Sequence, residues 1–200
     1  AFVSNSPESS RMFRLGWMEA LSKVHFSVPL LLYLPLIGYC LWQAPLAWSS
    51  LGLYAGGLFA WSFVEYVLHR FVFHWMPPGK IGARLHFIFH GVHHDYPNDR
   101  LRLVMPPSVS IPLAVLFFSA YYALFGAPNV YPFFAGFVTG YLFYDMMHYA
   151  MHHLNWKNPL FQQLKQHHML HHYQQPDKGF GVSNPLWDFV FNTTFRLKKR

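Results

Sequence analysis

Residues 131–153 read YPFFAGFVTGYLFYDMMHYAMHH, an apolar run that ends in histidines one helical turn apart. Residues 46–74 repeat this design, because a second apolar run ends at His69 and His74. An apolar run of about 20 residues can cross a hydrocarbon core about 30 Å thick as an α-helix. Clustered imidazoles are typical ligands of metal ions. The two stretches therefore predict membrane helices that carry a metal site at one end.

The composition is typical of a protein whose solvent is the lipid bilayer. Of the 200 residues, 53% are hydrophobic and only 12% are charged, whereas soluble proteins have roughly 25% charged residues. An aromatic content of 20% excludes intrinsic disorder. The basic residues behind the formal charge of +7 form no arm or stripe interleaved with aromatic residues, so no nucleic acid partner is expected. The single cysteine, Cys40, excludes an internal disulfide.

Four apolar stretches predict four transmembrane helices, at about 24–41, 46–68, 109–125 and 131–151. The links 42–45 and 126–130 contain no Lys or Arg, and every basic residue lies in the other three segments between or beyond the spans. By the positive-inside rule, those segments are cytoplasmic. We therefore expect an all-α integral membrane protein. An N-terminal cytoplasmic segment (1–23) would precede one membrane domain (24–200), in which two helical hairpins carry a cytoplasmic helical cap with the histidines.

The 14 histidines are clustered, and ten of them repeat along the chain with an offset of 78 or 79 positions. The chain thus reads as one unit used twice. Each unit is a hairpin, a histidine pair at the end of its second helix, and then a His-X-X-His-His element. The ten predicted ligands are His69, His74, His90, His93, His94, His148, His152, His168, His171 and His172. The other four are not predicted ligands: His25, His86, His153 and His167.

The number and spacing of these histidines favour a two-metal centre. Residues three and four apart share one face of an α-helix, whereas His69 and His74, five apart, need a bulge or a helix end to converge. A structural zinc ion takes four ligands, so ten imidazoles fit two ions with about five each and an open position for oxygen. Imidazole suits zinc, copper, iron and nickel alike. Iron is favoured because zinc has no redox chemistry.

Two acidic residues fall inside the predicted spans, where a charge is costly unless it is paired. Glu65 is one turn before His69, and Asp145 is three residues before His148. Each could accept the distal N–H of a ligand histidine and so fix its tautomer. The alternative is an acid that snorkels or pairs with an arginine.

Several motifs resemble the fatty acid hydroxylase superfamily, and within it the fatty acid 2-hydroxylases. They are EYVLHRFVFH at 65–74, HFIFHGVHH at 86–94, RLVMPP at 102–107, YDMMHYAMHH at 144–153 and HMLHHY at 168–173, followed by GFGVS at 179–183. Histidine boxes also occur in desaturases, sterol oxidases and carotene hydroxylases, whereas the RLVMPP run resembles the 2-hydroxylases in particular. The likeness extends over about residues 65–200.

The resemblance implies a four-helix membrane enzyme that uses two metal ions, dioxygen and two electrons. It implies hydroxylation at carbon 2 of a long acyl chain, in a fatty acid or in the N-acyl group of a sphingolipid, with the ten ligands given above. A sterol or lipid desaturase or C-methyl oxidase of the same superfamily is the alternative. The residues predicted to line a substrate pocket, or else to be ordinary interfacial aromatics, are Tyr141, Tyr144 and Tyr149.

The electron donor is expected to be a separate protein of the cytochrome b5 or ferredoxin type. Animal and fungal relatives often carry a fused cytochrome b5 domain with a His-Pro-Gly-Gly haem loop, a motif that this sequence lacks. An acidic carrier could dock on a basic face, although contacts with lipid headgroups explain the same residues equally well. This face would consist of Arg84, Arg100, Arg102, Arg196, Lys198, Lys199 and Arg200. The membrane would be the endoplasmic reticulum in a eukaryote or the inner membrane in a bacterium.

Overall fold

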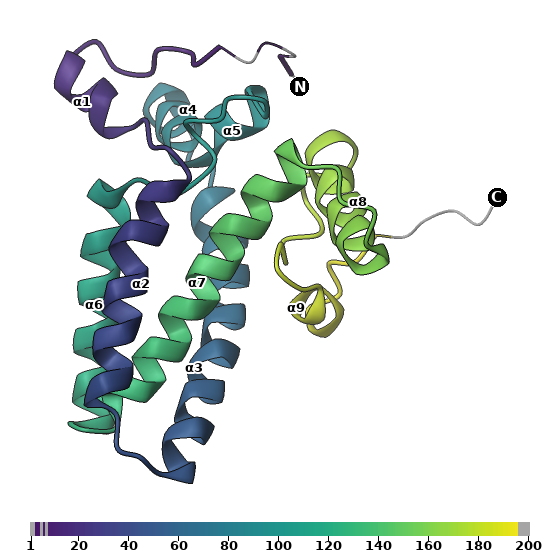
Figure 1. Ribbon diagram of the computed structural model, residues 1–200. Helices are drawn as coiled ribbons and strands as arrows, with labels where there is room; N and C mark the ends of the chain where they lie inside the picture. The colour runs from purple at the N-terminus through teal and green to yellow at the C-terminus, as the bar shows by residue number, and fades with distance from the viewer. Residues whose placement is uncertain (1–2, 5, 7, 196–200) are drawn as a thin grey trace. The chain divides into compact units, whose positions relative to one another are not determined.

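The computed structural model describes residues 3, 4, 6 and 8–195 (Figure 1), and the regular structure in this part of the chain is helical. The predicted all-helical class is therefore confirmed. The basic tail residues 196–200 lie outside the described residues. The elements are α1 (Gly16–Leu21), α2 (Ser27–Gln43), α3 (Trp48–Val67), η1 (Leu68–Phe73), α4 (Gly79–His86), η2 (Phe87–Gly91), α5 (Val92–Asp95), α6 (Pro107–Phe125), α7 (Val130–His153), α8 (Pro159–Tyr173) and α9 (Leu186–Val190), where η denotes a π-helix.

The chain forms two compact units, each described below by itself. The bundle unit consists of Arg11–Trp61 and Arg100–Met146. The histidine unit consists of Ala1–Ser10, Ser62–Asp99 and Met147–Arg200. Both α3 and α7 supply residues to each unit.

In the bundle unit, α2, α3 and α6 all pack against α7. Tyr33 of α2 and Trp61 of α3 meet the ring of Tyr141 edge-on, with ring centroids 5.2 and 5.3 Å away. Phe118 of α6 meets Phe134 of α7 in the same way at 5.1 Å. Edge-on aromatic pairs contribute about 0.5–1.5 kcal/mol each beyond the area that they bury. The aromatic residues of α7 therefore form the core on which the other helices assemble.

The outward surface of the bundle unit is apolar. Val115, Leu116 and Leu124 of α6 are 61%, 62% and 73% exposed, and only 6% of the apolar stretch of this helix is buried. A soluble protein would bury such a helix in its core. A lipid environment therefore explains this surface better than water does.

Two helical segments are long and apolar enough to cross a membrane: Trp48–Phe73, which joins α3 to η1, and Pro107–Phe125. The apolar α2 is shorter, with 17 residues. The predicted fourth span lies in α7, whose second half carries Asp145 and histidines, and this helix does not meet the same criterion of length and apolarity. Length and composition thus support two of the four predicted spans, and the four-span topology stays a prediction.

Arg102 holds the N-terminal segment against the loop before α6, within the bundle unit. Its guanidinium donates to Glu19 Oε1 at 2.6 Å and to Ser22 Oγ at 2.9 Å. The side chain of Arg102 is only 2% exposed. Arg102 is therefore an interior residue and not part of a basic docking face, which corrects the expectation from the sequence.

Gly57 of α3 lets the backbones of α3 and α7 approach closely. A Cβ atom at this position would collide with the carbonyl group of Phe133 and would lie 2.7 Å from the backbone nitrogen of Phe137. By contrast, a Cβ atom at Gly52, on the same helix, would meet nothing within 4 Å. The two glycines therefore form a matched pair for testing this contact.

We expect Gly57→Ala to destabilise the bundle unit by about 1–3 kcal/mol, because the added methyl group forces two helix backbones apart. Gly52→Ala is the control, and it should leave the melting temperature unchanged or raise it, since alanine favours a helix more than glycine does. Thermal unfolding in detergent, followed by circular dichroism, measures both variants. Equal melting temperatures would show that the close approach of the helices is absent.

Candidate metal centre

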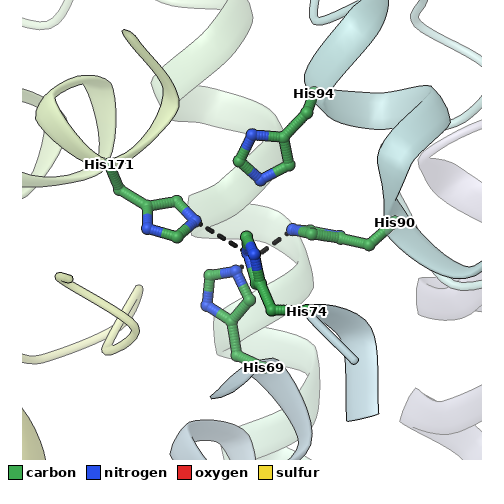
Figure 2. A group of neighbouring side chains, drawn as sticks. All are labelled: His69, His74, His90, His94 and His171. Atoms are coloured by element: carbon green, nitrogen blue, oxygen red, sulfur yellow. Dashed lines mark hydrogen bonds between the residues drawn. The ribbon is translucent and has the colours of Figure 1, made fainter. Parts of the chain in front are cut away.

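The ten histidines predicted as ligands gather in two groups of five, and every one of them lies in the histidine unit. Within each group, the candidate ligand atoms lie within 4.8 Å of one another. Seven of the ten side chains are buried and three are half-buried. Site one consists of His69, His74, His90, His94 and His171, whose rings converge in Figure 2. Site two consists of His93, His148, His152, His168 and His172.

The two sites are direct neighbours. His94 of site one stacks on His172 of site two, with ring centroids 4.1 Å apart and planes inclined by 20°. Two ions held by these groups would therefore occupy one common pocket, which is the arrangement of a two-metal centre.

Each site takes one histidine from the opposite half of the sequence. Site one contains four histidines of the first half together with His171, and site two contains four of the second half together with His93. His93 and His171 are equivalent in the sequence repeat, since they are 78 positions apart and both stand in the middle of a His-X-X-His-His element. The repeat predicted that the histidines converge, but the exchange is visible only in the structure.

Helix geometry explains this division. Successive residues of an α-helix are rotated by about 100°, so residue i+4 lies about 40° ahead of residue i, and residue i+3 about 60° behind it. In the element on α8, the outer histidines would therefore point to one ion and the middle one to a second ion beside it. In the second element, His168 and His172 belong to site two and His171 to site one.

The bulge expected between His69 and His74 is confirmed as the π-helix η1. The backbone N–H of His74 donates to the carbonyl of His69 at 3.2 Å, which is the wider turn of a π-helix. This turn places the two rings 5.0 Å apart, centroid to centroid. A second π-helix, η2, carries His90, and the spacing of the histidines did not predict it.

The distances between imidazole nitrogens fit metal binding. Four pairs of Nε2 atoms, two in each site, lie 2.8–3.1 Å apart. Two nitrogens bound to one ion at about 2.1 Å are about 3.0 Å apart at a right angle, and about 3.4 Å apart at a tetrahedral angle. The observed pairs are close to the first of these separations. The residues present therefore fit two metal ions, each held by up to five imidazoles.

Backbone carbonyl groups fix the orientation of two ligands of site one. The Nδ1 atom of His69 donates to the carbonyl oxygen of Phe180 at 2.6 Å, and that of His171 donates to the carbonyl of Lys178 at 2.6 Å. A carbonyl oxygen only accepts, so Nδ1 holds the proton and the lone pair of Nε2 faces the site. The sequence does not single out these acceptors, since every residue has a carbonyl group. The only signal was the GFGVS motif at 179–183, within which Phe180 lies.

Glu65 supports the same loop, although its expected partner was His69. Its Oε1 atom accepts from the backbone N–H groups of Val182 at 2.7 Å and Ser183 at 2.8 Å, and its Oε2 atom accepts from the Ser183 hydroxyl. The Nδ1 atom of His69 is already paired with Phe180. Glu65 therefore binds the loop that contains Phe180, and the Nδ1 atom of His69 donates to that loop and not to Glu65.

Asp145 is buried in the bundle unit, beside the loop before α6. Both of its carboxylate oxygens lie 3.4 Å from the backbone nitrogen of Met105, and it also interacts with Tyr141. Within this unit, Asp145 therefore anchors the RLVMPP segment. Its expected hydrogen bond to His148 stays a prediction.

The three tyrosines predicted to line a substrate pocket have different surroundings. Tyr141 and Tyr144 are buried in the bundle unit, with ring centroids 5.3 and 5.9 Å from that of Trp61. Tyr149 belongs to the histidine unit and packs on His153, at a centroid distance of 4.7 Å. Their role in binding a substrate stays a prediction.

Burial keeps the site histidines neutral. Burial, followed by neighbouring imidazoles, lowers the pKa of His74 and His94 to about 2. Burial also lowers the pKa of His171 to about 4, although its hydrogen bond to the carbonyl of Lys178 raises it. The neutral imidazole is the form that binds a metal ion. The site is therefore ready for metal binding at neutral pH.

We expect the metal-free protein to lose stability as the pH falls below about 6.5, the pKa of an unfolded histidine. The pKa of His74 and of His94 is lower in the folded state, so below this pH the unfolded chain binds more protons. Between about pH 7.5 and 5.5 the free energy of unfolding then falls by roughly 1 kcal/mol in total for each such group. Melting temperatures of chelator-treated protein between about pH 7.5 and 5.5 test this, and a rise on acidification would contradict it.

The exchange of histidines predicts which pairs of substitutions affect the same ion. His93→Ala combined with His148→Ala should leave about one ion per chain, because both residues belong to site two. His93→Ala combined with His74→Ala should leave about none, although both residues stand in the first half of the sequence. Elemental analysis of purified protein gives the number of ions, with His153→Ala as a control that keeps two. The reverse pattern would contradict the division into sites described here.

Comparisons with known proteins agree with this geometry. The family model for fatty acid hydroxylase matches residues 54–193. The dihydroceramide fatty acyl 2-hydroxylase FAH1 of Arabidopsis thaliana is 38% identical over 192 residues, which are 93% of this chain and 80% of that protein. The fatty acid 2-hydroxylase of Mus musculus is 36% identical over 210 residues, covering 92% of this chain and 56% of that protein.

A solved structure, described as full-length scs7p with only the hydroxylase domain visible, superposes with a TM-score of 0.83 at 36% sequence identity. The match covers 92% of this chain and 72% of that one. The resemblance seen in the histidine motifs and the RLVMPP run is thereby confirmed. The chain belongs to the fatty acid hydroxylase family.

Proposed function

We propose that the protein hydroxylates carbon 2 of a long-chain fatty acid or of the N-acyl chain of a sphingolipid. The observation that carries this proposal is the pair of adjacent five-histidine sites. Two neighbouring sites of this kind suit the activation of dioxygen, which a single closed metal site does not. The names of the relatives add the substrate class, since FAH1 of Arabidopsis thaliana is a dihydroceramide fatty acyl 2-hydroxylase.

The ten histidines would hold two iron ions. Iron is preferred over zinc because the reaction needs a metal that changes its oxidation state. When bound, the ions would supply the redox chemistry that inserts one oxygen atom of dioxygen into a C–H bond. The chain itself supplies neutral imidazoles, most of them buried, and fixes two of them through the carbonyls of Lys178 and Phe180.

The balance of the reaction requires an electron donor. A C–H bond becomes C–OH, the second oxygen atom leaves as water, and two electrons with two protons are consumed. A separate protein of the cytochrome b5 or ferredoxin type would deliver the electrons. An acidic carrier would dock by charge complementarity, and of the basic residues expected at the docking face, Arg84 and Arg100 are exposed whereas Arg102 is buried.

The substrate and the membrane setting follow from the apolar surface. We infer a four-span topology in which residues 24–200 form one membrane domain, supported by the two long apolar segments and the exposed side chains of α6. His69 and His74 lie at the end of the segment Trp48–Phe73, so the metal sites would stand near the headgroups. There, an acyl chain held by its polar end presents the carbons next to its carboxyl group.

Within this proposal, several side chains keep predicted roles. Tyr141, Tyr144 and Tyr149 would line the acyl pocket or hold the polar end of the lipid. Asp145 would orient His148, and Glu65 would support site one through its loop. The membrane would be the endoplasmic reticulum in a eukaryote or the inner membrane in a bacterium.

Expression of the protein in cells that lack 2-hydroxylated lipids should produce 2-hydroxy acyl chains, detected by mass spectrometry. His93→Ala should abolish the product because site two loses a ligand. His25→Ala removes an exposed histidine that belongs to neither site, and it should leave the yield unchanged. A product that loses two hydrogens and gains no oxygen would identify the alternative, a desaturase. A wild-type protein that binds metal but forms no 2-hydroxy product would contradict the proposed function.

A further inference from the structure

Asp188 in α9 is a fully buried carboxylate that the sequence did not single out; its exposed fraction is 0%. Its Oδ1 atom accepts from the backbone N–H of Phe180 at 2.9 Å and from the Thr193 hydroxyl at 2.7 Å. Its Oδ2 atom accepts from the backbone N–H of Gly181 at 2.8 Å. Three donors thus compensate one buried charge, and charge-assisted hydrogen bonds of this kind are among the strong ones.

The residues that Asp188 holds are those that orient the ligands of site one. Phe180 donates its N–H to Asp188 and accepts the Nδ1 proton of His69 with its carbonyl group. The backbone of Phe180 therefore connects the two side chains, with its N–H bound to the Asp188 carboxylate and its carbonyl bound to the ligand His69. Two residues earlier in the same loop, the carbonyl of Lys178 accepts from His171. A displacement of this loop would move the acceptors of two site-one ligands together.

Thr193 closes the network on the side of the helix that carries His69. Its hydroxyl lies 3.0 Å from the Tyr66 hydroxyl, which also accepts from Arg70 at 2.7 Å. The carbonyl of Thr193 accepts from the N–H of Gly179 at 2.9 Å. Tyr66 precedes His69 by three residues, so the hydrogen bonds form a closed ring from that helix through Thr193, Asp188 and Phe180 back to His69.

Three of the five site-two ligands lack a hydrogen bond of this kind in the part of the chain that the structure describes. Among the residues that the structure describes, the Nδ1 atoms of His93, His168 and His172 have no hydrogen-bond acceptor. A hydrogen bond from Nδ1 to a carbonyl raises the basicity of the imidazole and fixes its orientation, and the loss of such a partner typically weakens metal affinity about 10- to 100-fold. The two sites therefore differ in how firmly their ligands are held.

We propose that Asp188 is a positioning residue for site one, and that through the loop 178–183 it makes site one the tighter of the two metal sites. This inference rests on the two-metal centre of the proposed function, but it concerns metal binding and not the substrate. It assigns to Asp188 an effect confined to one ion of the pair.

Asp188→Asn tests this assignment directly. Asparagine keeps the shape of the side chain, but one of its two terminal atoms is a donor, so an N–H or O–H group of the network loses its acceptor. We expect the affinity of one site for iron(II) to fall about 10- to 100-fold, while the other site is unchanged. Equilibrium dialysis with iron(II) gives the affinities, and Mössbauer spectra of iron-57 show whether one of two iron signals is lost. Asp177→Asn, an exposed neighbour with the same change of charge, is the matched control and should retain both signals.

Combination with ligand variants identifies the affected site. In the background of His148→Ala, which weakens site two, Asp188→Asn should remove the remaining ion. In the background of His74→Ala, which weakens site one, it should cause no further loss. Equal weakening of both sites, selective weakening of site two, or unchanged binding in Asp188→Asn would each overturn the proposal.

A milder pair of variants keeps the test decisive should Asp188→Asn fail to fold. Thr193→Val removes the hydroxyl that donates to Asp188, whereas Thr193→Ser retains it. The valine variant should bind iron(II) more weakly at site one, and the serine variant should bind it as the wild type does. Identical metal binding in the two variants would overturn the proposal. These measurements need no substrate. A wild-type protein without hydroxylase activity would therefore count against the proposed function and leave the inference on Asp188 intact.

Discussion

The convergence of imidazole lone pairs is the constraint on which this structure depends. In each site, Nε2 atoms of buried, neutral histidines face one another at about the distance of two ligands on one ion. A neutral imidazole carries its single N–H on one of its two nitrogens, and the other nitrogen has a lone pair. In His69 and His171 the Nδ1 atom donates to a carbonyl group, so the Nε2 lone pair faces the site. Burial disfavours the charged form, as the low pKa of His74 and His94 shows, and the neutral form is the one that binds a metal ion.

The local structure around the sites serves this convergence. The π-helix η1 brings His69 and His74 to one face at a spacing that an α-helix would separate. Glycine is required in the loop that supports site one, because Gly179 has φ of +70° and a Cβ atom there would meet the ring of Phe195. Both of these backbone features adjoin ligands or supporting residues of site one.

The sequence predicted the chemistry of the site better than its arrangement. Spacing alone selected all ten histidines that the structure gathers in the two sites, since the offset of 78 or 79 and the helical period leave a clear pattern. The division into sites depends on which ion each helix face meets, and no local pattern contains that information. The carbonyl groups of Lys178 and Phe180 have no side-chain signature, and Asp188 looks like any acidic residue of a short helix.

The fold shows the same distinction. Hydropathy located the apolar helices α2, α3, α6 and α7, because long apolar runs are a strong signal. It did not show that Arg102 is buried against Glu19, since a basic residue beside a span is most often at the surface. It also did not reveal η2, because the extra residue of a π-helix has no reliable signal in composition.

The reciprocal placement of His93 and His171 has a consequence for the origin of the chain. Each half of the sequence contributes four histidines to one site and one histidine to the other site. Two copies of a half-length chain related by a twofold axis would complete both sites in the same way, because each copy would supply one ligand to the site of the other. The present protein thus has the ligand pattern of a symmetric dimer joined by gene duplication and fusion.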